Sequence, residues 1–204
     1  AAVARRRSGV GLPGDYHSFV QYAAGELVRF GPEDYHTDTV AQQAKDLVGD
    51  LSAGDPPSFL WSSFIAPHGT CDGGSSRTCS APPPPADRHA DILEDVALPS
   101  LDSPSFNERD VSDKPPAIRR RPVSPQEQQH LFTQRIRTLA ALDEAVAGIV
   151  AELERTGELD DTVVLFTSDN GYLFGEHRLT GKNVPYEEAL GVPLLVRGPG
   201  IPRG

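Results

Sequence analysis

Apolar residues recur at helical spacing early in the chain, within "HTDTVAQQAKDLVGDL". Their offsets of three and four residues place them on one face of a helix. They are Val40, Ala44, Leu47, Val48 and Leu51. The pattern predicts a helix that starts near Thr37 or Asp38, either of which is a suitable N-cap, and that stops at Gly54 and the two prolines soon after it.

A second, longer helix is predicted over residues 125–156. Ser124 is its expected cap, Pro125 suits the first helical position, and Glu127 would complete a capping box. Apolar positions then keep spacings of three and four residues as far as Gly157. They are Leu131, Leu139, Leu142, Val146, Ile149 and Leu153, with the aliphatic stem of Arg135.

Three apolar runs are predicted to be strands: "SFLWSSFIA" at 58–66, "DTVVLFTS" at 161–168 and "VPLLVRG" at 192–198. Because the runs are continuous rather than alternating, we expect helices to bury both faces of their sheet. The order of strand, long helical crossover and strand predicts an α/β fold with a mostly parallel or mixed sheet flanked by helices.

Other segments lack a periodic pattern. Residues 1–34 are mixed in composition and are expected to be irregular, while residues 69–123 are rich in proline, serine and charge. Proline removes a hydrogen-bond donor and fixes φ, so this long excursion is either disordered or a functional lid. Cys71 and Cys79 lie in it, and the sequence leaves open whether they are bridged.

Composition narrows the class of partner. The 204 residues, 38% of them hydrophobic, suffice for one sizeable core. A net charge of -10 argues against a nucleic-acid partner, and the arginine triplets at 5–7 and 119–121 are interpreted as solvated loop charge. No apolar run is long enough for a membrane span, and the first residues lack the apolar core of a signal peptide. The sequence leaves the compartment and the oligomeric state open. Since the sequence contains no methionine, we expect a piece of a longer protein.

Candidate chemistry follows the second predicted strand, where "TSDNG" occupies 167–171. Asp169 and Asn170 offer hard oxygen donors of the kind that Ca²⁺ and Mg²⁺ prefer, and Gly171 would let the backbone turn. A simple turn is the alternative, since these are also common turn residues. His68 follows the first predicted strand, and ligands gather at the carboxyl ends of strands in α/β sheets.

An ordered set of motifs resembles the sulfatase family of the alkaline-phosphatase superfamily. The set comprises "FLWSSFIAPHGT", "FTSDNG", "GEH", the lysine of "TGK", "YEE" and "VPLLVRGPGIPRG". The stretches "SFNERDVSDKP" and "TGELDDTVVLFTSDNGY" are similar to the N-acetylglucosamine-6-sulfatase branch. The resemblance covers roughly residues 35–204 and implies an alkaline-phosphatase-like fold, here incomplete.

The resemblance also implies site roles. Asp169 and Asn170 would be two ligands of a Ca²⁺ ion, with Mg²⁺ in some members, that also binds the sulfate ester. Lys182 and His68 would contact the sulfate and help to protonate or stabilise the departing alcohol oxygen. His177 would line the substrate pocket. The substrate would be a small-molecule or glycan sulfate ester.

The resemblance implies one catalytic domain, of which residues 1–204 are a part. Its expected segments are the irregular 1–34, the helix and strand of 35–68, the loop or lid of 69–123, and 124–204 with the long helix, the metal-site strand and the substrate loop.

Family elements are missing from these 204 residues. Sulfatases use a formylglycine made within Cys-x-Pro-Ser-Arg, and that motif is absent here, as are an acidic pair and a Lys-x-His element. We therefore expect a fragment of a sulfuric ester hydrolase that releases no sulfate alone. The alternatives are an inactive, truncated sulfatase-like module, and a phosphodiesterase or phosphatase of the same superfamily, which Asn170 argues against because those enzymes hold two metal ions with more Asp and His ligands.

Overall fold

A computed structural model describes residues 9–10, 16–23, 25–54, 56–70, 79 and 81–202. The chain divides into two compact units, and each is described by itself. Unit 1 comprises Ala1–Ile92 and Gln134–Thr162, and unit 2 comprises Leu93–Thr133 and Val163–Gly204.

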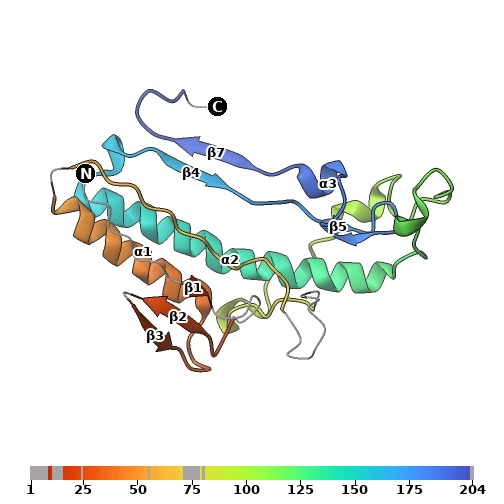
Figure 1. Ribbon diagram of the computed structural model, residues 1–204, viewed down its shortest axis with the longest axis horizontal. Coiled ribbons are helices and arrows are strands. Elements are labelled where there is room, and N and C mark those ends of the chain that lie inside the picture. Colours follow the sequence, from red (N-terminus) through yellow and green to blue (C-terminus); the bar gives the residue numbers. More distant parts are fainter. Residues whose placement is uncertain are drawn as a thin grey trace. The chain divides into compact units, whose positions relative to one another are not determined.

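Both predicted helices are present (Figure 1). Helix α1 spans His36–Ser52, and its N-cap is Tyr35 rather than Thr37 or Asp38, because both of those residues already lie inside the helix. Helix α2 spans Pro125–Thr156, as its pattern predicted, and contributes its first turns to unit 2 and the remainder to unit 1.

Ser124 caps α2 as expected. The backbone N–H of Glu127 donates to Ser124 Oγ over 3.3 Å. The reciprocal bond, in which the Ser124 N–H would donate to the Glu127 carboxylate and complete a capping box, does not form among the described residues. The cap satisfies one of the donors that every helix N-terminus leaves open.

Within unit 1, α1 lies beside α2 (Figure 1), and glycines lie at their contact. A Cβ atom at Gly49 would lie 3.4 Å from Glu152 Oε1, and one at Gly148 would lie 3.6 Å from Lys45 Cδ. Small residues at these positions leave room for the side chains of the facing helix. The buried core of unit 1 contains Tyr16, Tyr35, Ala66, Ala86 and Ala141.

The strands of unit 1 differ from the prediction. Residues 1–34 were expected to be irregular, but β1 (Gly9–Val10), β2 (Val20–Ala23) and β3 (Glu26–Arg29) form an antiparallel sheet. The β2–β3 hairpin is too short to show a period in the sequence, and it turns at Gly25, whose φ is +98°.

The predicted strand at 58–66 is also wrong. These residues form no strand in the described part of the chain, and no neighbouring segment there pairs with them. Phe59 and Trp61 are 84% and 79% exposed. A strand needs a hydrogen-bonding partner as well as apolar side chains, and periodicity reports only the second.

In unit 2, β4 (Val164–Thr167) pairs with β7 (Leu194–Arg197), so two predicted strands are present. The hairpin of β5 (Leu173–Phe174) and β6 (Thr180–Gly181) and the short helix α3 (Glu187–Leu190) lie between them in sequence. Every pairing of named strands among the described residues is antiparallel, so the parallel pairs of the prediction do not occur in this part.

The expected burial of both sheet faces is not found either. All four residues of β7 are exposed, and the exposed fraction of Leu165 in β4 is 64%. The reason is that β4 and β7 form a sheet of only two strands, which leaves their side chains without a covering layer in the described residues. The core of unit 2 lies elsewhere and contains Leu173, Leu179 and Ala189, with Val184 and Tyr186 packed against it.

The described part of the proline-rich excursion has the irregular backbone that its composition predicted, with three short 3₁₀ turns at Asp87–His89, Pro99–Asp102 and Pro116–Ile118. Its function as a lid stays a prediction. Cys79 is disulfide-bonded, whereas Cys71 lies outside the described residues, as does the arginine triplet at 5–7. Within the described ranges, no helix has the length and apolar character to cross a membrane.

Candidate functional site

The Asp-Asn-Gly turn follows β4 directly. The Ser168 hydroxyl donates to the Asn170 carbonyl oxygen over 2.9 Å, and Asn170 Nδ2 donates to the carbonyl of Gly171 over 2.8 Å. These local bonds fix the amide, whereas the exposed Asp169 carboxylate has no hydrogen-bond or ion-pair partner in the described part of the chain. The turn therefore presents a free carboxylate beside an oriented amide oxygen.

Gly171 is required by a close contact and not by its φ angle. A Cβ atom there would lie 2.1 Å from the carbonyl oxygen of Glu188, far inside van der Waals contact. The Gly171 N–H donates to the carbonyl of Ala189 over 2.9 Å. The turn is thereby attached to α3, which differs from the sequence interpretation of a residue that lets the chain turn.

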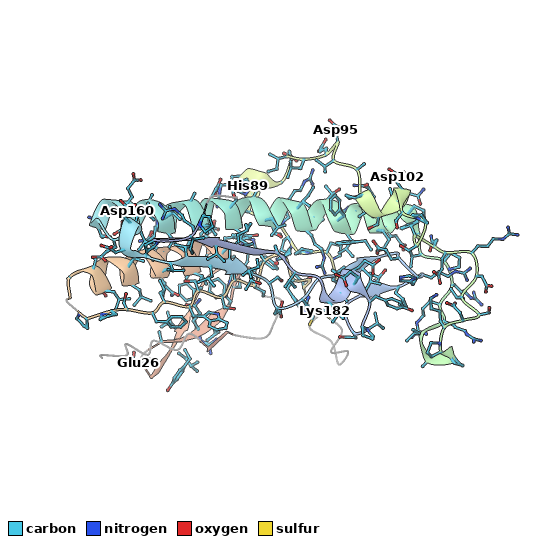
Figure 2. All side chains as sticks on the ribbon, turned by 90° about the horizontal axis from the view of Figure 1, so that it is seen from above. Glu26, His89, Asp95, Asp102, Asp160 and Lys182 are labelled. Atoms are coloured by element: carbon cyan, nitrogen blue, oxygen red, sulfur yellow. The ribbon has the colours of Figure 1, made fainter. Side chains whose placement is uncertain are left out.

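Lys182 forms a hydrogen bond with Asn170. Its Nζ donates to Asn170 Oδ1 over 2.7 Å, although the two residues are 12 positions apart. Lys182 follows β6 and is labelled in Figure 2. The structure thus brings together one predicted metal ligand and the predicted sulfate-binding lysine within unit 2.

The oxygen atoms at this turn match the ligand type of a hard cation but not the full number of ligands. The Asp169 carboxylate and Asn170 Oδ1 are suitable oxygen ligands. Although Asn170 Oδ1 accepts a hydrogen bond from Lys182, it keeps a second lone pair for a cation. Ca²⁺ takes about six to eight oxygen ligands. The described residues contain no cluster of three or more His, Cys, Asp and Glu side chains that could hold a metal ion. The pair fits such an ion in chemistry and would supply part of its coordination sphere.

His177 occupies the turn of the β5–β6 hairpin, where its φ is +54°. Its Nδ1 donates to Glu108 Oε2 over 2.9 Å, and its ring stacks on Tyr186 with centroids 4.1 Å apart. Because a carboxylate can only accept, Nδ1 carries a proton and Nε2 is the nitrogen left for a ligand. His177 is rigidly held and does not contact Asn170 or Lys182 directly.

Glu108 was missed by sequence reasoning. Besides His177, its carboxylate binds Lys114 Nζ, with 2.5 Å between Lys114 Nζ and Glu108 Oε1. The hydrogen bond from Lys114, more than that from His177, lowers the pKa of Glu108 below its ordinary value. Glu108 lies in the proline-rich excursion, so no local pattern links it to the hairpin.

Arg178 was also missed. Its guanidinium donates to three backbone carbonyls of the excursion, those of Glu108 (2.9 Å), Arg109 (2.8 Å) and Arg120 (3.4 Å). These carbonyls are neutral, so the bonds fix the guanidinium without forming an ion pair.

Asn107 attaches the excursion to the hairpin, since its backbone N–H donates to the carbonyl of Gly175 over 2.9 Å. Its side chain exchanges two hydrogen bonds, of 2.9 and 2.8 Å, with the backbone of Val123 within the excursion. Gly175, with φ of +114°, lies under Phe106, because a Cβ atom there would be 2.3 Å from its ring.

The first turns of α2 support the same hairpin from unit 2. Phe132 and Phe174 meet edge to face with ring centroids 5.7 Å apart, and the Thr180 hydroxyl donates to Gln128 Oε1 over 3.0 Å. A cleft of about 680 Å³ lies against the hairpin and is lined by residues of unit 2 that include Lys182. The predicted lysine is therefore accessible to a ligand.

His68 belongs to unit 1. The hydroxyl of Tyr16 donates to its carbonyl over 2.7 Å, and its Nδ1 donates to the carbonyl of Gly69 over 2.8 Å. Its half-buried ring therefore has Nε2 left for a ligand, as in His177. That His68 and Lys182 contact one anion stays a prediction.

The family model described as Sulfatase matches residues 8–204. The chain belongs to the sulfatase family. This sulfatase-family chain is 37% identical over 182 residues to an arylsulfatase of Volvox carteri, covering 83% of this chain and 28% of that protein. It is 32% identical over 195 residues to human N-acetylglucosamine-6-sulfatase, covering 91% of this chain and 32% of that protein. The recognition from motifs is thereby confirmed, and the chain spans about a third of these relatives.

Solved structures confirm the fold. One, described as a complex with its substrate D-glucosamine-2-N,6-O-disulfate, aligns with a TM-score of 0.63 at 20% identity, over 93% of this chain and 49% of its own. The expected α/β, alkaline-phosphatase-like architecture is therefore present, in incomplete form. At this identity the likeness supports the fold and not the substrate.

Proposed function

We propose that this chain is the part of a sulfuric ester hydrolase that binds the sulfate group and a divalent cation. The observation that carries the proposal is the 2.7 Å hydrogen bond between Lys182 Nζ and Asn170 Oδ1. It joins an amide that would bind a cation to an ammonium that would bind an anion, and this pairing supports a site for a sulfate ester with a bound metal ion.

Asp169 and Asn170 would hold the cation, with Ca²⁺ as the first candidate and Mg²⁺ as the second. When bound, such an ion neutralises negative charge on the sulfate oxygens. The exposed Asp169 carboxylate would approach the ion without first breaking a bond, and Asn170 is already oriented by Lys182 and Gly171.

Lys182 and His68 would act on the ester itself. Cleavage of a sulfate ester develops negative charge on the departing oxygen, and an ammonium or an imidazolium stabilises that charge or supplies a proton. For His68 the proton must come from Nε2, because Nδ1 is bonded to the Gly69 carbonyl. His177 has the same arrangement and would contact the substrate through Nε2.

A sulfated sugar is the proposed substrate class. One relative is named N-acetylglucosamine-6-sulfatase, and one fold neighbour is described with a disulfated glucosamine substrate. The 204 residues contain no Cys-x-Pro-Ser-Arg, so this chain alone is expected to bind the ester without releasing sulfate. Binding is therefore the property to measure.

The test is calorimetric titration of the chain with glucosamine 6-sulfate, comparing the natural sequence with Lys182→Met. Loss of a charged hydrogen-bond donor to the sulfate should weaken binding about tenfold. Lys45→Met is the matched control. Lys45 lies on α1 in unit 1, so this substitution removes the same charge away from the proposed site.

Equal weakening by both variants would show a general effect of net charge and would contradict the proposal. Unchanged affinity in Lys182→Met would do the same. Circular dichroism of each variant confirms that the fold is retained.

A further inference from the structure

The cleft that contains Lys182 is strongly cationic. Four of its lining residues are basic, namely Arg120, Arg121, Arg178 and Lys182, and none is Asp or Glu. The chain as a whole has a net charge of -10, so this concentration of positive charge is opposite to its average. A charged concavity of this kind concentrates ligands of the opposite sign.

Among the described residues, the basic side chains of the cleft form no ion pairs. Arg178 donates only to backbone carbonyls, and Arg120 Nη1 donates to the carbonyl of Arg119 over 3.0 Å. Arg121 has no hydrogen-bond or ion-pair partner among the residues that the structure describes. An arginine fixed by neutral partners keeps its full charge for a ligand.

Two acidic groups of the same excursion are engaged by Lys114. Glu108 binds Lys114 and His177, and Asp113 binds Lys114 with an N–O distance of 2.9 Å. Lys114 is thus the neutralised cation of this segment, and it does not line the cleft. Among the described residues, no carboxylate of the segment forms an ion pair with a cleft arginine. Asp110 accepts the Ser112 N–H and is attracted to Arg178 without a direct ion pair.

Apolar side chains form another part of the wall. They are Ile118, Val123, Leu173, Leu179 and Val184, and Thr180, Gly181 and Asn183 complete the lining. Apolar walls exclude water and strengthen the attraction between a bound anion and the arginines. With a volume of about 680 Å³, the cleft is within the usual range for a small-molecule site and larger than a single sulfate needs.

We propose that Arg120, Arg121 and Arg178 bind a second anionic group of the substrate, a sulfate or a carboxylate, while Lys182 binds the sulfate ester that is cleaved. The substrate class is then a saccharide with at least two anionic groups, rather than a monosulfated compound. This inference rests on the proposed function, since it assigns the reacting sulfate to Lys182. It gives Arg120 and Arg121 of the 119–121 triplet a role beyond solvated loop charge, although both are exposed as expected.

The test compares glucosamine 6-sulfate with glucosamine N,6-disulfate by calorimetric titration of the chain at one fixed ionic strength. The natural sequence should bind the disulfate about tenfold more tightly, since the second group gains charge-assisted hydrogen bonds. The double variant Arg120→Gln, Arg121→Gln should reduce that ratio to about twofold or less, while affinity for the monosulfate changes little.

Arg109→Gln is the matched control. Arg109 is an exposed arginine of the same excursion, its side chain makes no hydrogen bond among the described residues, and it does not line the cleft. It should leave the disulfate-to-monosulfate ratio unchanged. An equal loss of the ratio in this control would show a long-range charge effect and overturn the proposal.

Other results that overturn the inference are equal affinity for both sugars, a ratio that survives the double variant, and no binding of either sugar. Inorganic sulfate forms a third arm, and binding of free sulfate as tight as that of the disulfate would show a separate anion site instead of a substrate subsite. If both sugars bind equally but Lys182→Met still weakens them, the inference falls and the proposed function stands. If Lys182→Met has no effect while the ratio depends on the arginines, the proposed function falls.

Discussion

At the scale of single residues, local motifs revealed the polar groups that lie close together in sequence. The turn residues Asp169 and Asn170 and the nearby Lys182 belong to family motifs, and Lys182 does meet Asn170. Glu108 and Arg178 were not found, because their contacts with each other and with the hairpin join positions 69 or 70 residues apart. A long-range contact between irregular segments leaves no periodic signal in the sequence.

The Glu108 contact makes a pH-dependent contribution to stability. Two hydrogen bonds lower the pKa of Glu108 from the ordinary 4.5, and the one from Lys114 has a larger effect than the one from His177. A carboxyl whose pKa is lower in the folded state stabilises the fold above its unfolded-state pKa, and this contribution is lost as pH falls through the folded-state value. Glu108→Gln should therefore be less stable than the natural sequence at pH 7, and the difference should shrink below about pH 4.5.

Thermal unfolding followed by circular dichroism between about pH 7 and pH 3 measures this difference. Glu154→Gln is the control, since Glu154 is an exposed carboxylate near the end of α2. A Glu108→Gln profile parallel to that of the natural sequence at every pH would contradict the assignment.

At the scale of elements, the long helix with a clear cap and a sustained apolar pattern was predicted accurately, whereas the short strands were not. Helix α2 begins and ends where its apolar spacing, Ser124 and Gly157 indicated. The segment at 58–66 has strand-like composition but no pairing partner in the described residues, and the β2–β3 hairpin has a partner but little apolar pattern. Strand formation depends on neighbours that are distant in sequence, whereas helix formation depends mainly on residues within one or two turns.

The cap of α2 can be tested directly. Ser124→Ala removes the oxygen that accepts the Glu127 N–H, and we expect a loss of about 0.5–2 kcal/mol in the free energy of unfolding. Urea denaturation measures it. Ser58→Ala, at an exposed serine without a hydrogen bond in the described chain, should change the unfolding free energy by less than about 0.5 kcal/mol. Equal stability of both variants would show that the cap does not contribute.

At the scale of the whole molecule, family and fold were predictable because an ordered set of motifs extends over much of the chain. The family match covers residues 8–204, and the fold neighbour covers 93% of the chain. The sheet arrangement was less predictable: apolar runs indicated a sheet buried on both faces, while β4 and β7 form an exposed antiparallel pair. The cationic cleft was not predictable, since it combines arginines of the excursion with the hairpin, and only the folded chain brings these segments together.

The central claim is that Asp169, Asn170 and Lys182 serve one site for a cation and a sulfate ester. Asp169 and Asn170 supply only part of a coordination sphere, so Ca²⁺ alone should bind weakly. If both ligands share the site, each must raise the affinity for the other by the same factor.

The most direct measurement is a calorimetric titration of the chain with glucosamine 6-sulfate, with and without saturating Ca²⁺, repeated on Asp169→Ala. The account predicts that Ca²⁺ raises the affinity for the ester about fivefold or more, and that Asp169→Ala abolishes this increase while leaving the Ca²⁺-free affinity nearly unchanged. An affinity independent of Ca²⁺, or tight Ca²⁺ binding that survives Asp169→Ala, would contradict it.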